Sequence, residues 1–248
     1  MPLLAADAAW PSHALLVVVW AALGWVAGVV LNRPIHQLPR DQPPLHQPHC
    51  EHCGRPVPVL GWPGRRACAG CGAPLEYDRV EWLTAPLFAL LAIQFGPSGS
   101  LAVYSVYTLI LLIVAAVDFR TRYVYAIVVY PGVLLAAVLT PLLNGVDLMA
   151  TLMGIGVGAG IFTAFYLAGL LLYRGTEPIG KGDIEIAALA GAMLGFPRVL
   201  SALFLGGFVS AAVVLVLLLA RRRGRRDFIP YGPGMCLGTF AAFFMAPQ

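Results

Sequence analysis

The sequence contains very little charge. Only 11% of its 248 residues are charged, whereas 59% are hydrophobic, and the mean hydropathy is +0.81. A soluble domain carries roughly a quarter charged residues and about half apolar ones. Polar surface this scarce could not cover a water-soluble globule of this size. The composition therefore excludes an ordinary soluble protein and predicts an all-α protein that crosses a lipid bilayer several times.

Lysine is nearly absent, since Lys181 is the only one, and arginine supplies almost all of the net charge of +4. The arginines lie between apolar runs and are not interleaved with aromatic residues, so nothing here predicts nucleic-acid binding. The first ten residues also lack the basic stretch of a secretory signal peptide. The apolar run that follows ends at Asn32-Arg33-Pro34 and not at a small-residue cleavage site, so we expect a retained first helix.

Long apolar runs dominate the rest of the chain. About 20 apolar residues in helical form span the hydrocarbon of a bilayer, with tolerance for tilted or buried segments. Eight segments are predicted on this basis, at 13–31, 81–95, 101–117, 124–143, 147–173, 184–196, 199–220 and 229–246. The short segments 81–95 and 184–196 could be interior helices that cross only in part. The glycine-rich segment 147–173 predicts close helix packing or a tilt.

The basic residues fall on one side of this predicted bundle. If the amino terminus lies outside, every basic residue except Arg198 lies in an inside connection, at 32–80, 118–123, 174–183 or 221–228. Cytoplasmic connections carry such an excess of basic residues. We therefore expect a multi-pass protein embedded in membrane lipid, with its amino terminus outside.

Cysteine is scarce, and four of the five lie in one polar connection. Cys50 and Cys53 form one CxxC pair, and Cys68 and Cys71 form a second. Two such pairs supply the four thiolates of a closed tetrahedral site, so the spacing predicts structural zinc in a ribbon-like loop. Four thiols without metal, or two redox CxxC motifs, stay open as alternatives. So does a site in which a neighbouring imidazole, His49 or His52, replaces one thiolate.

This loop divides the chain into three predicted parts. They are a first transmembrane helix at 1–31, a cytoplasmic cysteine-rich zinc loop at 32–80, and a helical membrane domain at 81–248. The fifth cysteine, Cys236, lies in the last apolar segment and is predicted to be a small buried residue.

Acidic residues are rare in the apolar half, so each one needs a reason. Asp118 ends one apolar segment and Asp183 precedes another, both at predicted cytoplasmic ends of helices. Two carboxylates that meet in the bundle cannot both ionise easily. One can then activate a water while the other protonates the substrate. The alternatives are an ion pair between Asp118 and the arginines two and four residues later, and a helix N-cap role for Asp183.

Two other acidic residues receive lesser roles. Asp147 is expected to cap a helix on the outer face. Glu185 is expected to lie near Asp183 but on another side of the helix, where it could support the site.

Six features follow one another along the chain. They are Gly28-Val-Val-Leu31-Asn32 through Leu38-Pro39, the paired CxxC loop, Glu76 through Glu81, Asp118, Gly180-Lys-Gly-Asp183, and Ile229-Pro-Tyr-Gly-Pro233. In this order they resemble the type IV prepilin peptidases, over nearly the full chain. Two positions depart from that family. Val124-Tyr125-Ala126 stands where Ile/Leu-Pro-Asp is usual, and Glu185 stands where a basic residue is frequent.

The resemblance implies a membrane aspartic endopeptidase in which Asp118 and Asp183 share the acid–base work. Its substrates would be prepilins or type II secretion pseudopilins, cut after a glycine on the cytoplasmic face to release a short basic leader. Many members also methylate the new amino terminus with S-adenosylmethionine. No residue of this sequence is assigned to that methyl donor, because no glycine-rich strand-loop-helix pattern is present.

Two other functions stay open. A proton-coupled transporter could use Asp118 and Asp183 as relay groups, which predicts carboxylates near the bilayer midplane. A non-cleaving homologue would bind prepilins without cutting them.

Overall fold

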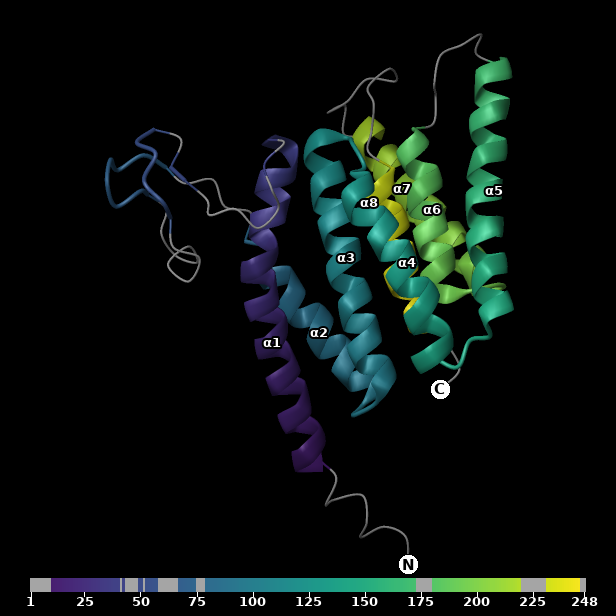
Figure 1. Cartoon of the computed structure of the whole chain (residues 1–248), viewed down its shortest axis with the longest axis horizontal. Helices are drawn as coiled ribbons and strands as arrows, with labels where there is room; N and C mark the ends of the chain where they lie inside the picture. The colour runs from purple at the N-terminus through teal and green to yellow at the C-terminus, as the bar shows by residue number, and fades with distance from the viewer. Residues whose placement is uncertain are drawn as a thin grey trace, which may run out of the picture. The chain divides into compact units, whose positions relative to one another are not determined.

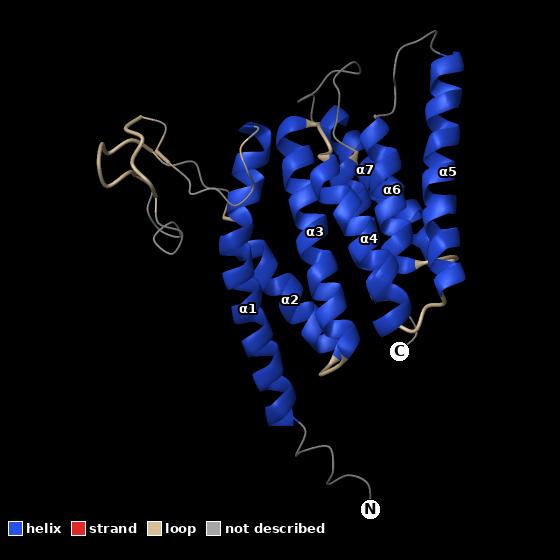
Figure 2. Ribbon diagram, in the orientation of Figure 1, coloured by secondary structure: helices blue, strands red, loops and turns tan. Residues whose placement is uncertain are grey.

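The computed structural model describes residues 10–40, 42, 49–50, 52–57, 67–74, 79–172, 180–219 and 231–245. Within these ranges all regular structure is helical, as Figure 2 shows, and the predicted all-α class is confirmed. The elements are α1 (Trp10–Gln37), the short 3-10 helix η1 (Leu38–Arg40), α2 (Glu81–Phe95), α3 (Gly99–Thr121), α4 (Ala126–Leu143), α5 (Leu148–Leu172), α6 (Lys181–Leu194), α7 (Arg198–Leu219) and α8 (Gly232–Phe243) (Figure 1).

Five of the described helices, α1, α3, α4, α5 and α7, are long and apolar enough to cross a membrane. The helices α2, α6 and α8 are shorter, with 15, 14 and 12 residues. Large apolar side chains are widely exposed, for example Leu171 at 83% and Phe204 at 75%. Such surfaces suit lipid, in which apolar side chains lose nothing by exposure. A helix occurs at each of the eight predicted places, while the number of complete crossings stays a prediction.

Helix α1 ends later than the sequence predicted. The first helix was expected to end at residue 31, but α1 continues through Pro34 to Gln37. Its last turns are buried, with Ile35 fully covered. Pro34 has no N–H to donate within the helix, yet α1 continues for three residues beyond it. Burial of this face therefore outweighs the helix-breaking tendency of proline.

The chain divides into two compact units, Met1–Ser105 and Val106–Gln248, with the division inside α3. In the N-terminal unit, α1 packs closely along α2. A Cβ added to Gly28 would lie 2.7 Å from Thr84 Oγ1 and would overlap the backbone of Glu81. This approach buries Glu81 to 2% exposure, and its carboxylate accepts a hydrogen bond from Asn32 Nδ2 at 3.1 Å. A buried polar pair thus joins the two helices.

In the C-terminal unit the short helix α6 lies at the centre and contacts α4, α5, α7 and α8 (Figure 1). Every residue from Leu189 to Leu194 is buried, as expected for an interior helix. Small residues permit this position. A Cβ added to Gly154 of α5 would lie only 2.5 Å from the carbonyl oxygen of Gly191, and one added to Gly158 would overlap the carbonyl oxygen of Ala187. The predicted close packing of the glycine-rich segment is confirmed.

Replacing Gly154 by alanine tests the contact between α5 and α6. The new methyl group would press on the Gly191 carbonyl, and overpacking of this kind costs roughly 1–3 kcal/mol. We expect the melting temperature in detergent to fall by about 2–4 °C for each kcal/mol. Gly156→Ala is the matched control, because its methyl group meets no atom within 4 Å. Equal melting temperatures for the two variants would contradict the packing described here.

Candidate active site and metal site

The four loop cysteines lie in two turns of the same design. In each turn the N–H of the first cysteine donates to the carbonyl five residues later, at 2.9 Å for Cys50 and 2.8 Å for Cys68. The amides of Gly54 and Gly72 donate back to the carbonyls of these cysteines at 2.8 and 2.9 Å. Both glycines have positive φ, 66° and 71°, a conformation that glycine adopts without a steric penalty. The spacing of the cysteines and the glycine that follows each pair therefore account for the conformation of each turn.

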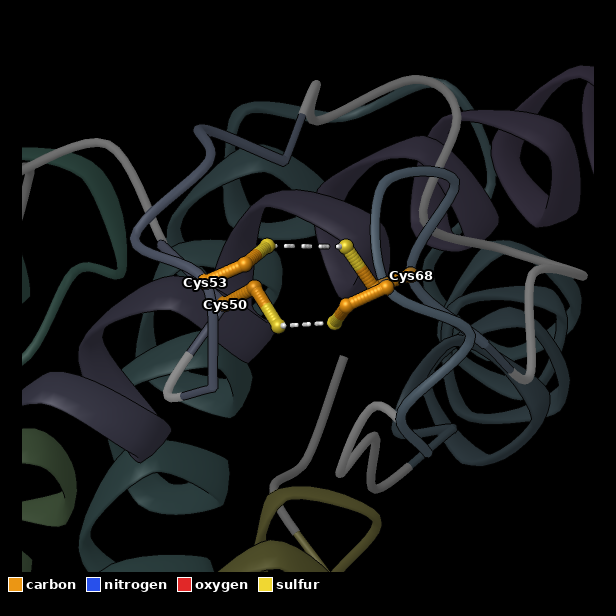
Figure 3. Close-up of side chains that lie close together, drawn as sticks. Cys50, Cys53 and Cys68 are labelled. Atoms are coloured by element: carbon orange, nitrogen blue, oxygen red, sulfur yellow. Dashed lines mark hydrogen bonds between the residues drawn. The ribbon is translucent and has the colours of Figure 1, made fainter.

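The two turns bring four sulfur atoms together. The Sγ atoms of Cys50, Cys53, Cys68 and Cys71 all lie within 4.8 Å of one another. The Cys50–Cys71 and Cys53–Cys68 pairs are 3.5 and 3.6 Å apart (Figure 3). Zinc–sulfur bonds of about 2.3 Å in a tetrahedron place the sulfurs about 3.8 Å apart. The donor set therefore fits a closed four-thiolate site that needs neither His49 nor His52.

The backbone also favours the thiolate form in this cluster. The N–H of Gly70 donates to Cys68 Sγ at 3.4 Å. This donor, followed by the N–H of Cys71, lowers the pKa of Cys68 to about 6. The thiolate is the form of cysteine that binds metal. The loop can thus hold a metal ion such as Zn²⁺.

Asp118 lies in the last turn of α3 and is buried, with 6% of its surface exposed. The helix ends soon after it, where Arg122 has a φ of 59° and donates its N–H to the Asp118 carbonyl at 2.8 Å. The side-chain oxygen Oδ2 of Asp118 is buried and has no hydrogen-bond partner. A buried oxygen without a donor is costly. This environment is unlike the interfacial ion pair that was the alternative for Asp118.

Asp183 lies in the first turn of α6. The N-cap of this helix is Gly180, so the alternative of an N-cap role for Asp183 is wrong. The Asp183 N–H donates to the Gly180 carbonyl at 3.1 Å. The second glycine of the motif is required by packing, because a Cβ on Gly182 would lie 2.5 Å from Cγ2 of Val124. The glycines thus allow the start of α6 to pack against the segment that follows α3.

Asp118 and the start of α6, which carries Asp183, both lie beside the start of α8. Gly232, the first residue of α8, lies against both α3 and α6. A Cβ built on Gly232 would be 2.5 Å from Asp118 Oδ2 and 2.9 Å from Cδ1 of Ile186, which lies one turn after Asp183 on α6. The structure therefore brings together the two carboxylates that the sequence singled out, although α4 and α5 separate them along the chain.

The start of α8 is part of this site, a role that sequence reasoning did not assign to it. Gly232 packs against the Asp118 carboxyl group, because a Cβ built on it would lie 2.5 Å from Oδ2. Cys236 is buried as predicted, at 3% exposure. The sequence did offer one indication of this role. The segment Ile229-Pro-Tyr-Gly-Pro233 resembles the family pattern, but that resemblance did not suggest a chemical role.

The two departures from the family pattern both lie where other elements meet α6. Val124 packs at the Gly182 position. Glu185 accepts a hydrogen bond from the Tyr130 hydroxyl of α4 at 2.9 Å. Away from the site, Asp147 accepts the N–H of Met149 at 3.2 Å, which confirms the expected cap on α5.

Comparison with known proteins is consistent with this arrangement. Residues 105–216 match the type IV leader peptidase family, and residues 22–95 match the bacterial peptidase A24 N-terminal domain. No solved structure matches the chain.

Several curated relatives carry the name prepilin leader peptidase/N-methyltransferase. The one from Aeromonas hydrophila is 30% identical over 216 residues, which cover 82% of this chain and 74% of the relative. The one from Burkholderia pseudomallei (strain K96243) is 33% identical over 79% of this chain, and the one from Myxococcus xanthus is 30% identical over 84%. The chain spans 65% of the length of each of these two, just under two thirds. With these similarities over most of its length, the chain belongs to the type IV leader peptidase family.

Proposed function

We propose that this protein is a membrane aspartic endopeptidase that removes the basic leader from type IV prepilins or type II secretion pseudopilins. The cut would follow a glycine, on the cytoplasmic face of the bacterial inner membrane. The observation that carries the proposal is that Asp118 of α3 and Ile186 of α6, one turn after Asp183, both lie against Gly232 of α8. The name shared by the relatives, prepilin leader peptidase/N-methyltransferase, supports the class of substrate.

In the proposed mechanism the two carboxyl groups divide the acid–base work. One carboxylate takes a proton from water as the water oxygen bonds to the scissile carbonyl carbon, and the other, protonated, donates to the carbonyl oxygen. Collapse of this intermediate breaks the C–N bond, and the leaving amine takes a proton from the pair. No covalent enzyme intermediate forms. Oδ2 of Asp118, buried without a donor, is an acceptor suited to such a proton.

The positions of the aspartates favour this function over proton-coupled transport. A relay for transport would place its carboxylates near the middle of the spanning helices. Asp118 instead lies in the last turn of α3, and Asp183 lies in the first turn of α6.

We also propose structural zinc at Cys50, Cys53, Cys68 and Cys71. The closed donor set leaves no open position for catalysis at the metal. When bound, the ion would tie the two turns of the loop together. The distribution of the arginines supports a cytoplasmic location for both this loop and the aspartates.

A second activity, N-methylation of the new amino terminus with S-adenosylmethionine, is supported by the name of the relatives. We assign no residues to the methyl donor.

Substitution of either aspartate tests the endopeptidase directly. We expect Asp118→Asn and Asp183→Asn each to lower kcat for prepilin cleavage by at least about 10²–10⁴-fold, because an amide can neither take nor give the proton. The measurement is loss of the leader from a purified prepilin in detergent. Asp147→Asn is the matched control, since Asp147 only caps α5. Wild-type rates in both active-site variants would exclude the protease assignment.

Zinc content tests the metal site. Elemental analysis of the purified protein is expected to give one zinc per chain, and Cys50→Ser/Cys53→Ser should lose it because two of four ligands are gone. Cys236→Ala should keep the zinc, since Cys236 lies on α8 outside the cluster. A wild-type protein without zinc, or a double variant that retains it, would refute the proposal.

Methylation is tested by mass spectrometry of the processed substrate. With S-adenosylmethionine present, the mature pilin should gain the mass of one methyl group at its amino terminus, and without it the leader should still be removed. An unmethylated product under both conditions would leave a peptidase without the second activity.

A further inference from the structure

We infer that Gly232, the first residue of α8, is a positioning residue for Asp118, and that the site works only with glycine there. The inference rests on the proposed function and deepens it, because it adds a third element to the two aspartates. It assigns no chemistry to Gly232 itself.

The contacts around Gly232 leave no room for a side chain. The residue is buried. A Cβ built on it would lie 2.5 Å from Oδ2 and 3.0 Å from Cγ of Asp118, and 2.9 Å from Cδ1 of Ile186. Carbon and oxygen atoms that are not bonded to each other do not approach so closely, so any side chain would displace one of these two neighbours. The carboxyl group of Asp118 and the side chain of Ile186 therefore both pack against the bare Cα of Gly232.

Backbone conformation gives no separate reason for glycine at this position. Gly232 lies within α8 and does not have the positive φ found at Gly54 or Gly72. An alanine could therefore adopt the same backbone conformation. The requirement comes from the neighbouring carboxyl group, which makes the position a probe of the site more than of the fold.

The start of α8 is held in place independently of Asp118. The hydroxyl of Ser210, on α7, donates to the Tyr231 carbonyl at 3.3 Å. The Tyr231 ring packs near Phe162 of α5, with centroids 6.2 Å apart. Gly206 of α7 lets the Met235 backbone approach so closely that an added Cβ would be 2.8 Å from its Cα. Since α8 is fixed by α5 and α7, a methyl group on Gly232 would move the Asp118 carboxyl more readily than the helix.

The position also lies between the two halves of the dyad. Ile186 follows Asp183 by one helical turn, so Gly232 contacts the helix that carries one aspartate and the side chain of the other. A shift here would change the separation of the two carboxyls, and misplacement by about 1 Å can cost about 10²-fold in rate.

The test compares two glycine-to-alanine variants in the same helix pair. In Gly232→Ala, kcat for prepilin cleavage should fall about 10²-fold, while KM should change by less than about threefold, because substrate contacts are kept. In Gly238→Ala, six residues further along α8, the new methyl group presses on the α7 backbone, 2.5 Å from the Ala202 carbonyl oxygen, and touches no carboxyl group. This control should lower the melting temperature at least as much as Gly232→Ala does, yet keep kcat close to the wild-type value.

A third variant separates the two neighbours of Gly232. Ile186→Ala removes the contact at 2.9 Å but leaves the one with Asp118. Gly232→Ala/Ile186→Ala should therefore remain as slow as Gly232→Ala, and it relieves part of the crowding if the single variant folds poorly. Recovery of wild-type kcat in the double variant would show that Ile186 was the obstacle and would overturn the inference.

The remaining outcomes distinguish this inference from the proposed function. Wild-type kcat in Gly232→Ala, together with an inactive Asp118→Asn, would overturn the inference alone. So would equal losses of kcat in Gly232→Ala and Gly238→Ala at equal melting temperatures. Cleavage by Asp118→Asn at the wild-type rate would instead remove the proposed function and this inference with it.

Discussion

The close approach of α6 to its neighbours is the contact on which the C-terminal unit depends. With 14 residues, α6 offers little contact surface along its length, yet it contacts four other helices. It does so because Gly191 and Ala187 expose backbone carbonyls that Gly154 and Gly158 of α5 can reach without a Cβ in the way. Packing between such small surfaces is what holds helices together in lipid, where the hydrophobic effect between them is lost.

The candidate active site follows from that central position. The first turn of α6 brings Asp183, which is half-buried, among the ends of other elements. Val124 closes the site from the segment after α3, and Gly232 closes it from α8. Glycine thus recurs at the site for one reason, which is that backbones and carboxyl groups meet there at distances that exclude side chains. The two acidic groups themselves come from helix ends.

Much of this could be predicted from the sequence. The helices could be predicted because long apolar runs in a chain with so little charge are typical of membrane-spanning helices. Asp118 and Asp183 stood out because acidic residues in apolar surroundings need partners. The CxxC pairs were recognised because both turns are local, and local geometry depends on spacing and on glycines such as Gly54.

Other features could not be predicted, because they depend on tertiary contacts. Hydropathy does not say which face of a helix is covered, so the continuation of α1 through Pro34 was missed. In the same way, the segment around Tyr231 and Gly232 was noticed only as a resemblance. Its contact with Asp118 depends on how α8 packs against α6 and α7, and apolar periodicity carries no information about such pairings.

The buried pair of Asn32 and Glu81 in the N-terminal unit has a consequence for biogenesis. A carboxyl group buried in protein at the start of α2 would be costly without a hydrogen-bond donor. Ribosomal synthesis proceeds from the amino terminus, so α1 and its Asn32 amide emerge before Glu81 does. The donor that lies 3.1 Å from the carboxylate is therefore already synthesised when Glu81 emerges, so the acid can gain its partner as soon as α2 packs against α1.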